Sequence, residues 1–236
     1  EFDKEKLELS GIDENKFKIK INTIEKNIKN LLIAVILITY YGDERYNKIL
    51  KKIISRVFPT GTFSGQTIAI SLLYIPALIL IYGIIITALE SEKYDVLKEI
   101  INMKDNKIDT YHYYRDTDSL ITNLFNRINE VSSSFKCLFP DQNYKYPMNE
   151  YLYKYLQPII DDILYIGDEY SDRYTNAEIL ISIAYAIKNY NDKDYVWGPT
   201  GRYLYILGYG NKDINKLPIN DVILKLGLYS EISNKD

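Results

Sequence analysis

The stretch IAISLLYIPALILIYGIIITAL, Ile68–Leu89, decides the fold of this chain. It ends a longer run, Val57–Leu89, that contains no Asp, Glu, Lys or Arg. About 20 apolar residues are enough for a helix to cross the hydrocarbon core of a bilayer. The stretch therefore predicts either a membrane span or the buried centre of a helical domain.

Three features of the stretch favour the buried centre. Tyr74 and Tyr82 lie within it, and lipid offers no hydrogen-bond partners for their hydroxyl groups. Pro76 lies near its middle, where one helix can end and a second can begin with proline in its first turn. Basic residues do not crowd one flank, because Arg56 is the nearest one before the stretch and Glu90 follows it directly. We expect two buried apolar helices, with a membrane anchor formed by Ile68–Leu89 as the alternative.

The neighbouring segments have the spacing of amphipathic helices that would pack around this centre. Tyr46, Ile49, Leu50 and Ile53 recur at intervals of three and four residues, with Lys and Arg opposite them. Residues 31–38 are apolar throughout but too few to span a bilayer. Further helices are expected over residues 92–103, 119–131, 149–166, 175–187 and 219–226, and the one over 149–166 is expected to break or kink near Pro158, which lacks a backbone N–H. The predicted fold class is all-α, an irregular multi-helix bundle around a central pair of buried apolar helices.

A minor strand near the N-terminus is the one possible exception. Phe17, Ile19 and Ile21 alternate with Lys16, Lys18 and Lys20, and a period of two is typical of a strand. The same residues could instead begin the next helix, which Asn22 or Thr23 could otherwise cap. Both readings of residues 16–21 fit the sequence.

The chain is expected to form one helical domain over residues 1–236. The polar, tyrosine-rich connector at residues 104–117 is the best candidate for a subdomain junction. The sequence begins at Glu1 without a methionine, so we expect a fragment of a larger protein or complex. A single cysteine, Cys137, and charged first residues predict a cytoplasmic location.

The composition offers no set of catalytic residues. His112 and Cys137 are the only histidine and cysteine, so a metal site of the His/Cys type cannot be assembled. We predict that the chain is not an enzyme and holds no cofactor and no metal. The net charge of −3 argues against broad nucleic-acid binding. A basic strip over Arg45–Arg56 leaves nucleic-acid binding as the weaker alternative.

Four segments resemble, in order, a helical region of prokaryotic proteins. They are Ile75–Gly83 together with Glu92–Leu97, then Tyr151–Pro158, Tyr174–Leu180 and Trp197–Tyr203. The region they resemble follows sirtuin-like or Schlafen/AlbA-type domains in bacteria and archaea, in proteins that look like antiviral defence components. The resemblance implies a non-catalytic regulatory, sensing or oligomerisation domain. It also implies a sirtuin-like effector domain or partner protein, and an oligomeric assembly.

The last of these segments supplies the candidate interaction residues. Its two glycines and one proline predict a turn, WGPTGRY, whose notable members are Trp197, Gly198, Pro199, Gly201 and Arg202. An arginine in such a turn is expected to form an ion pair, and Glu178 is the predicted partner. The alternative is that Arg202 contacts a phosphate or nucleotide. Trp197 is expected to cover Pro199.

Overall fold

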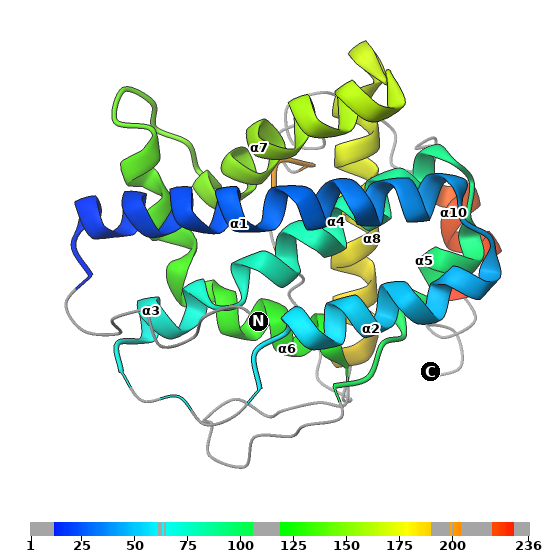
Figure 1. Ribbon diagram of the computed structural model, residues 1–236, viewed down its shortest axis with the longest axis horizontal. Helices are drawn as coiled ribbons and strands as arrows, with labels where there is room; N and C mark the ends of the chain where they lie inside the picture. The colour runs from blue at the N-terminus through cyan, green and yellow to red at the C-terminus, as the bar shows by residue number, and fades with distance from the viewer. Residues whose placement is uncertain are drawn as a thin grey trace.

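The computed structural model describes residues 12–60, 63, 65–105, 119–189, 199, 201–203 and 219–228. In these residues the chain is all-α, as predicted, and an isolated antiparallel bridge between Lys104 and Ser119 is its one β contact. Figure 1 shows the arrangement of the helices. Their bounds are α1 (Glu14–Tyr41), α2 (Asn47–Val57), α3 (Thr67–Leu72), α4 (Ile75–Glu90), α5 (Tyr94–Ile101), α6 (Leu120–Ile128), α7 (Pro147–Leu164), α8 (Tyr170–Asn189) and α10 (Ile219–Lys225).

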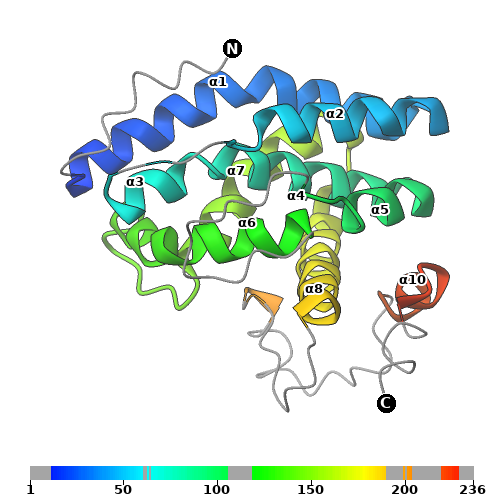
Figure 2. The ribbon, with the colours of Figure 1, turned by 90° about the horizontal axis from the view of Figure 1, so that it is seen from below.

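The helices form layers with α4 at the centre. Figure 2 shows α1 and α2 as an outer layer, α3, α4 and α5 beneath them, and α6 and α8 on the far side. Every side chain of α4 from Ile75 to Leu89 is buried, so this helix is apolar on all sides because protein surrounds it on all sides. The buried centre that the sequence predicts is therefore confirmed.

The break between the two central helices lies where the proline predicts it. Leu73 and Tyr74 separate α3 from α4, and Pro76 occupies the first turn of α4. Taken together, Thr67–Glu90 is long and apolar enough to cross a membrane, and it is the one such stretch in the residues described. The structure buries 83% of its most apolar window. The neighbouring helices thus fill the place that lipid would take around a membrane span.

Of the two readings of residues 16–21, the helix is correct and the short strand is wrong. Residues 14–41 form one continuous helix, and Asp13 caps it by accepting a hydrogen bond from the Lys16 N–H. Phe17, Ile21, Ile24 and Ile28 lie on its buried face at intervals of three and four, whereas Ile19 is 64% exposed. The alternation of apolar and basic residues is therefore too short to indicate a strand, and it lies within a longer helical pattern. Asn22 and Thr23 consequently lie inside the helix and do not cap it.

Two other helices differ from their expected bounds, since α7 is shifted two residues toward the N-terminus and α8 is longer at both ends. The helix α7 continues through Pro158 and ends at Leu164, where Tyr165 takes up a left-handed conformation. The helix α8 begins at Tyr170 rather than at Thr175. The Thr175 hydroxyl donates instead to the Ser171 carbonyl, four residues back in the same helix. Of the expected subdomain junction, only Lys104 and Asp105 lie within the described residues.

A close contact fixes how α1 crosses the central helix. Gly83 faces Leu32, and a Cβ atom at position 83 would lie 2.5 Å from Leu32 Cδ1. Such a distance is well inside van der Waals contact, so a side chain at position 83 would force the end of the Leu32 side chain to shift. Glycine at this point therefore leaves room for Leu32 between the two helices.

Replacing Gly83 by Ala should couple strongly to the truncation of Leu32. Leu32→Ala alone should lower the free energy of unfolding by roughly 2–5 kcal/mol, because it leaves a cavity in the core. The double variant should cost at least ~1 kcal/mol less than the sum of the single changes, since the new methyl group enters the vacated space. Urea denaturation of all four proteins measures this coupling. Additive costs would contradict the contact.

Candidate functional site

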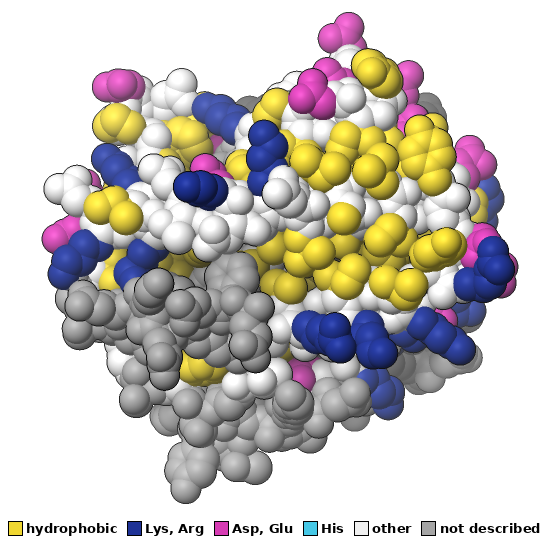
Figure 3. Space-filling view, in the orientation of Figure 1, with side chains coloured by type: hydrophobic (Ala, Val, Ile, Leu, Met, Phe, Trp, Pro, Cys, Tyr) yellow, Lys and Arg dark blue, Asp and Glu magenta, His cyan; other side chains and the backbone are white. Residues whose placement is uncertain are grey.

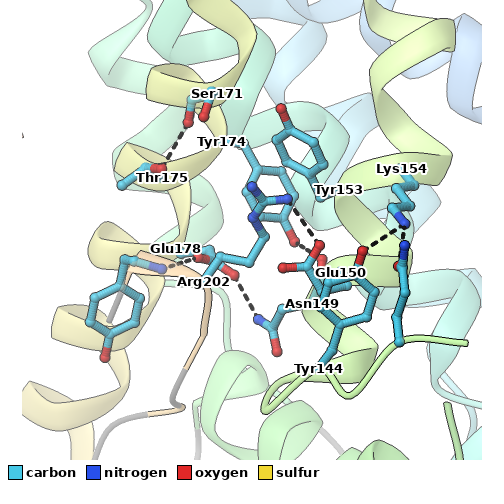
Figure 4. A network of polar contacts seen from close by, with 12 residues as sticks. Tyr144, Asn149, Glu150, Tyr153, Lys154, Ser171, Tyr174, Thr175, Glu178 and Arg202 are labelled. Atoms are coloured by element: carbon cyan, nitrogen blue, oxygen red, sulfur yellow. Dashed lines mark hydrogen bonds and ion pairs between the residues drawn. The ribbon is translucent and has the colours of Figure 1, made fainter. Parts of the chain in front are cut away.

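The polar cluster in Figure 4 joins three parts of the chain. The first turn of α7 supplies Asn149 and Glu150, the middle of α8 supplies Glu178, and the turn at residues 201–203 lies over both helices. Asn149, Glu150 and Glu178 are all buried, although buried carboxyl groups are rare unless they have partners. This cluster of buried polar groups is therefore the candidate functional site.

Glu178 holds the turn through its two carboxylate oxygens. Oε1 accepts a hydrogen bond of 2.7 Å from the Asn149 side-chain amide, and Oε2 accepts one of 2.9 Å from the backbone N–H of Tyr203. Burial raises the pKa of Glu178 to about 7, although these donors and the nearby Arg202 favour the charged form. Desolvation is thus the stronger effect at this carboxyl group.

Gly201 is needed because the turn approaches this carboxyl group so closely. A Cβ atom at position 201 would lie 2.5 Å from Glu178 Oε1 and 2.8 Å from Asn149 Nδ2. Both atoms are held by their hydrogen bond to each other, so neither can move away without breaking it. The turn therefore has no room for a side chain at position 201 next to this carboxyl group.

The ion pair predicted for Arg202 exists, but its partner is Glu150 and not Glu178. Arg202 Nη1 lies 3.2 Å from Glu150 Oε2, and its guanidinium carbon lies 3.5 Å from the centre of the Tyr153 ring. The prediction of Glu178 as the ion-pair partner was wrong, since its oxygens accept from the Asn149 amide and the Tyr203 N–H while the guanidinium of Arg202 lies at Glu150. Burial raises the pKa of Glu150, and the positive charge of Arg202 opposes that rise.

Tyrosine rings form the floor of the cluster, which sequence reasoning did not foresee. Tyr82 of α4 stacks on Tyr174 of α8, with ring centres 5.4 Å apart and planes 25° apart. The Tyr174 hydroxyl donates to the Asn149 carbonyl at 2.9 Å, and the Tyr170 hydroxyl donates to the Tyr153 carbonyl at 3.1 Å. Burial raises the pKa of both hydroxyl groups. The spacing of four between Tyr170 and Tyr174 was the available signal, since it places both on one helical face.

The other predicted members of the turn are only partly described. The Pro199 carbonyl accepts hydrogen bonds from the Ser182 hydroxyl at 2.8 Å and from the Tyr203 hydroxyl at 3.3 Å. Of the predicted residues, Gly201 thus lies against Glu178, whereas Arg202 pairs with Glu150 and Pro199 is bonded to Ser182 and Tyr203. Trp197 and Gly198 lie outside the described residues, as does His112.

The cluster is a structural tether, which we define as the contacts of Asn149, Glu150 and Glu178 that attach residues 201–203 to α7 and α8. A carboxyl group with a pKa of about 7 could exchange protons with a substrate. Glu178 is only 2% exposed, however, and the backbone of the turn covers it. In the part of the chain that the structure describes, no three His, Cys, Asp or Glu side chains lie close enough to hold a metal ion. The cluster therefore orders residues 201–203 against α7 and α8.

Comparison with known proteins yields no relative of this chain. No protein-family model matches it, and no curated protein or solved structure does so either. The contacts within the chain are therefore the basis for proposing a function.

The buried carboxyl group of Glu178 should make stability depend on pH. Its pKa is about 7 in the folded chain and near 4.5 in the unfolded chain, so folding favours the protonated form. The contribution of Glu178 to the free energy of unfolding is fully present below pH 4.5 and is lost as the pH rises through 7. The total loss is about 3 kcal/mol. Urea denaturation from pH 4.5 to 8 should show this loss relative to Glu178→Gln, which cannot ionise. Parallel curves for the two proteins would refute the assignment.

Proposed function

We propose that this chain is a non-catalytic regulatory module that docks a helix of a partner effector protein on the outer surface of α1 and α2. Exposed apolar side chains on that surface carry the proposal. The two helices lie side by side in the outer layer (Figure 2). The tethered cluster around Glu178 supports a role in ordering the chain rather than in chemistry.

The apolar part of this surface comes mainly from the second half of α1. Residues 31–41 contain no charged side chain, yet only one side of the helix is buried there. Leu37 is 40% exposed and Tyr41 is 73% exposed. Tyr46 and Ile49, at 44% exposed, extend the surface onto α2. Figure 3 shows the resulting apolar band, which is unusual on an exposed helix pair and typical of an interaction site.

Basic side chains border the band along one side only. Arg45, Lys48, Lys52 and Arg56 follow the helical face of α2 beside Ile49, and Figure 3 shows Lys and Arg in a row at this edge. Arg45 is paired with Asp43. For Lys48, Lys52 and Arg56, no carboxylate among the described residues lies at ion-pair distance. We define the apolar band and this basic row together as the docking face.

The one-sided charge indicates the kind of partner. A helix with an apolar face and an acidic edge would fill the space between α1 and α2 and place its carboxylates on the basic row. Nucleic acid fits less well, because its phosphates would meet an apolar band as well as the lysines. The resemblance to regions that follow sirtuin-like domains supports an effector domain as the source of such a helix. A cytoplasmic assembly with that effector is part of this proposal.

Site-specific crosslinking tests the docking face. A photoreactive phenylalanine analogue placed at Leu37 or Ile49 should crosslink to one protein, through a segment with the sequence pattern of an acidic amphipathic helix. The same analogue at Tyr165 is the matched control, because that side chain is 86% exposed and lies at the end of α7. The double change Lys48→Glu with Lys52→Glu should weaken the crosslink by about fivefold or more.

Four outcomes would overturn the proposal. Equal crosslinking at Tyr165 would show that the face has no special role. Crosslinking mainly to lipid would favour the membrane alternative, and crosslinking to nucleic acid would favour the basic strip as a nucleic-acid site. Turnover of NAD by the purified chain would refute the non-catalytic role.

A further inference from the structure

A groove between α1 and α7 is separate from both the tether and the docking face. Its volume is about 640 Å³, within the range of roughly 300–1,000 Å³ that is typical of small-molecule sites. The walls come from the first half of α1, from α7 and from Leu138 and Phe139. It is lined by aromatic, aliphatic and charged side chains together, which is the composition of a ligand site rather than of a packing defect.

One wall of the groove is aromatic, and Tyr155 is its more exposed member because Tyr151 is only 5% exposed. The rings of Tyr151 and Tyr155, one helical turn apart on α7, are stacked with centres 5.9 Å apart and planes 9° apart. The Tyr155 hydroxyl donates to the backbone carbonyl of Glu25 at 3.1 Å, which fixes this ring against α1. Phe139 lies at the same groove. Such a wall suits a planar ring system that can stack on it.

The Glu25 carboxylate of α1 and the buried Tyr151 hydroxyl of α7 lie close together. Burial raises the pKa of Glu25, and the nearby Tyr151 opposes that rise. The Tyr151 hydroxyl is buried without a hydrogen bond, because the two groups lie close together but do not meet at hydrogen-bond geometry. A buried hydroxyl without a partner is costly. The Glu25 carboxylate is only half-buried and lines the groove, so it can accept a hydrogen bond from an N–H group of a ligand.

The rim of the groove is basic. Lys26 and Lys29 of α1 are exposed, and neither has an ion-pair partner among the described residues. Lys154 of α7 is held in place by the Tyr144 hydroxyl at 3.0 Å and lies 4.7 Å from the centre of the Phe139 ring. Three ammonium groups around one carboxylate favour a ligand with more than one negative charge. On the face in Figure 3, basic side chains gather between α1 and α7.

We propose that the groove between α1 and α7 binds a nucleotide, with the base against Tyr155 and its N–H groups toward Glu25, and with the phosphates at Lys26, Lys29 and Lys154. The volume of the groove is too large for an amino acid alone, and the basic rim is unsuited to an uncharged aromatic compound. The site is independent of the docking face, which lies on the second half of α1 and on α2.

Calorimetric titration of the whole chain tests the site with three probes. These are ATP, adenosine and inorganic tripolyphosphate. ATP should bind at least about tenfold more tightly than either of the other two, because it alone can use both the wall and the rim. The double change Lys26→Ala with Lys29→Ala should weaken ATP binding by about tenfold or more and leave adenosine binding unchanged. Glu25→Gln should weaken ATP and adenosine but not tripolyphosphate.

The matched control is Lys48→Ala with Lys52→Ala, which removes the same charge from an exposed helix away from the groove. An equal loss of ATP affinity in this control would overturn the proposal, because the attraction would then be diffuse. Tripolyphosphate binding as tight as ATP binding would also overturn it, since the groove would then attract polyanions without recognising a base. The absence of measurable ATP binding would overturn it directly.

Discussion

The burial of α4 is the constraint on which the rest of the structure depends. A helix that is apolar on every side cannot face water, so each neighbour must turn an apolar surface toward it. The helices α1, α2, α5, α7 and α8 all do so. At Gly83 the Leu32 side chain of α1 fills the space that a larger residue would take. The amphipathic pattern of the outer helices is thus a consequence of the uncharged centre.

The polar cluster around Glu178 solves a different problem, because the turn at residues 201–203 has few apolar groups to bury. Hydrogen bonds and one ion pair attach it to α7 and α8 instead. Burying Glu178 disfavours its charged form, and the donors around it offset part of that cost. The tyrosine floor, which reaches from α8 to Tyr82 of α4, ties this turn to the centre of the fold.

The sequence predicted the fold class and the centre because both follow from hydrophobic pattern and from Pro76. It failed where the signal was short or where partners were distant in the chain. The alternation of residues 16–21 is too brief to distinguish a strand from a helix, and only the exposure of Ile19 decides it. The predicted partner of Arg202 was Glu178, and Glu150 was not considered, because nothing in the sequence shows that the first turn of α7 lies against residues 201–203. The sequence showed the basic row as the strip over Arg45–Arg56, but it did not predict the apolar band or the groove, because a pattern of apolar residues does not reveal which of them remain uncovered.

The helix α1 is common to all three features of interest, since its inner face packs on α4, its first half lines the groove and its second half forms the docking face. Its position depends on α4 being a protein core. Hydrogen exchange of the purified chain in detergent-free buffer tests this most directly. The account predicts that the chain remains folded without detergent and that amides of residues 78–89 exchange more slowly than those of α2, through global unfolding alone. A chain that requires detergent, or that protects residues 78–89 only in lipid, would contradict it.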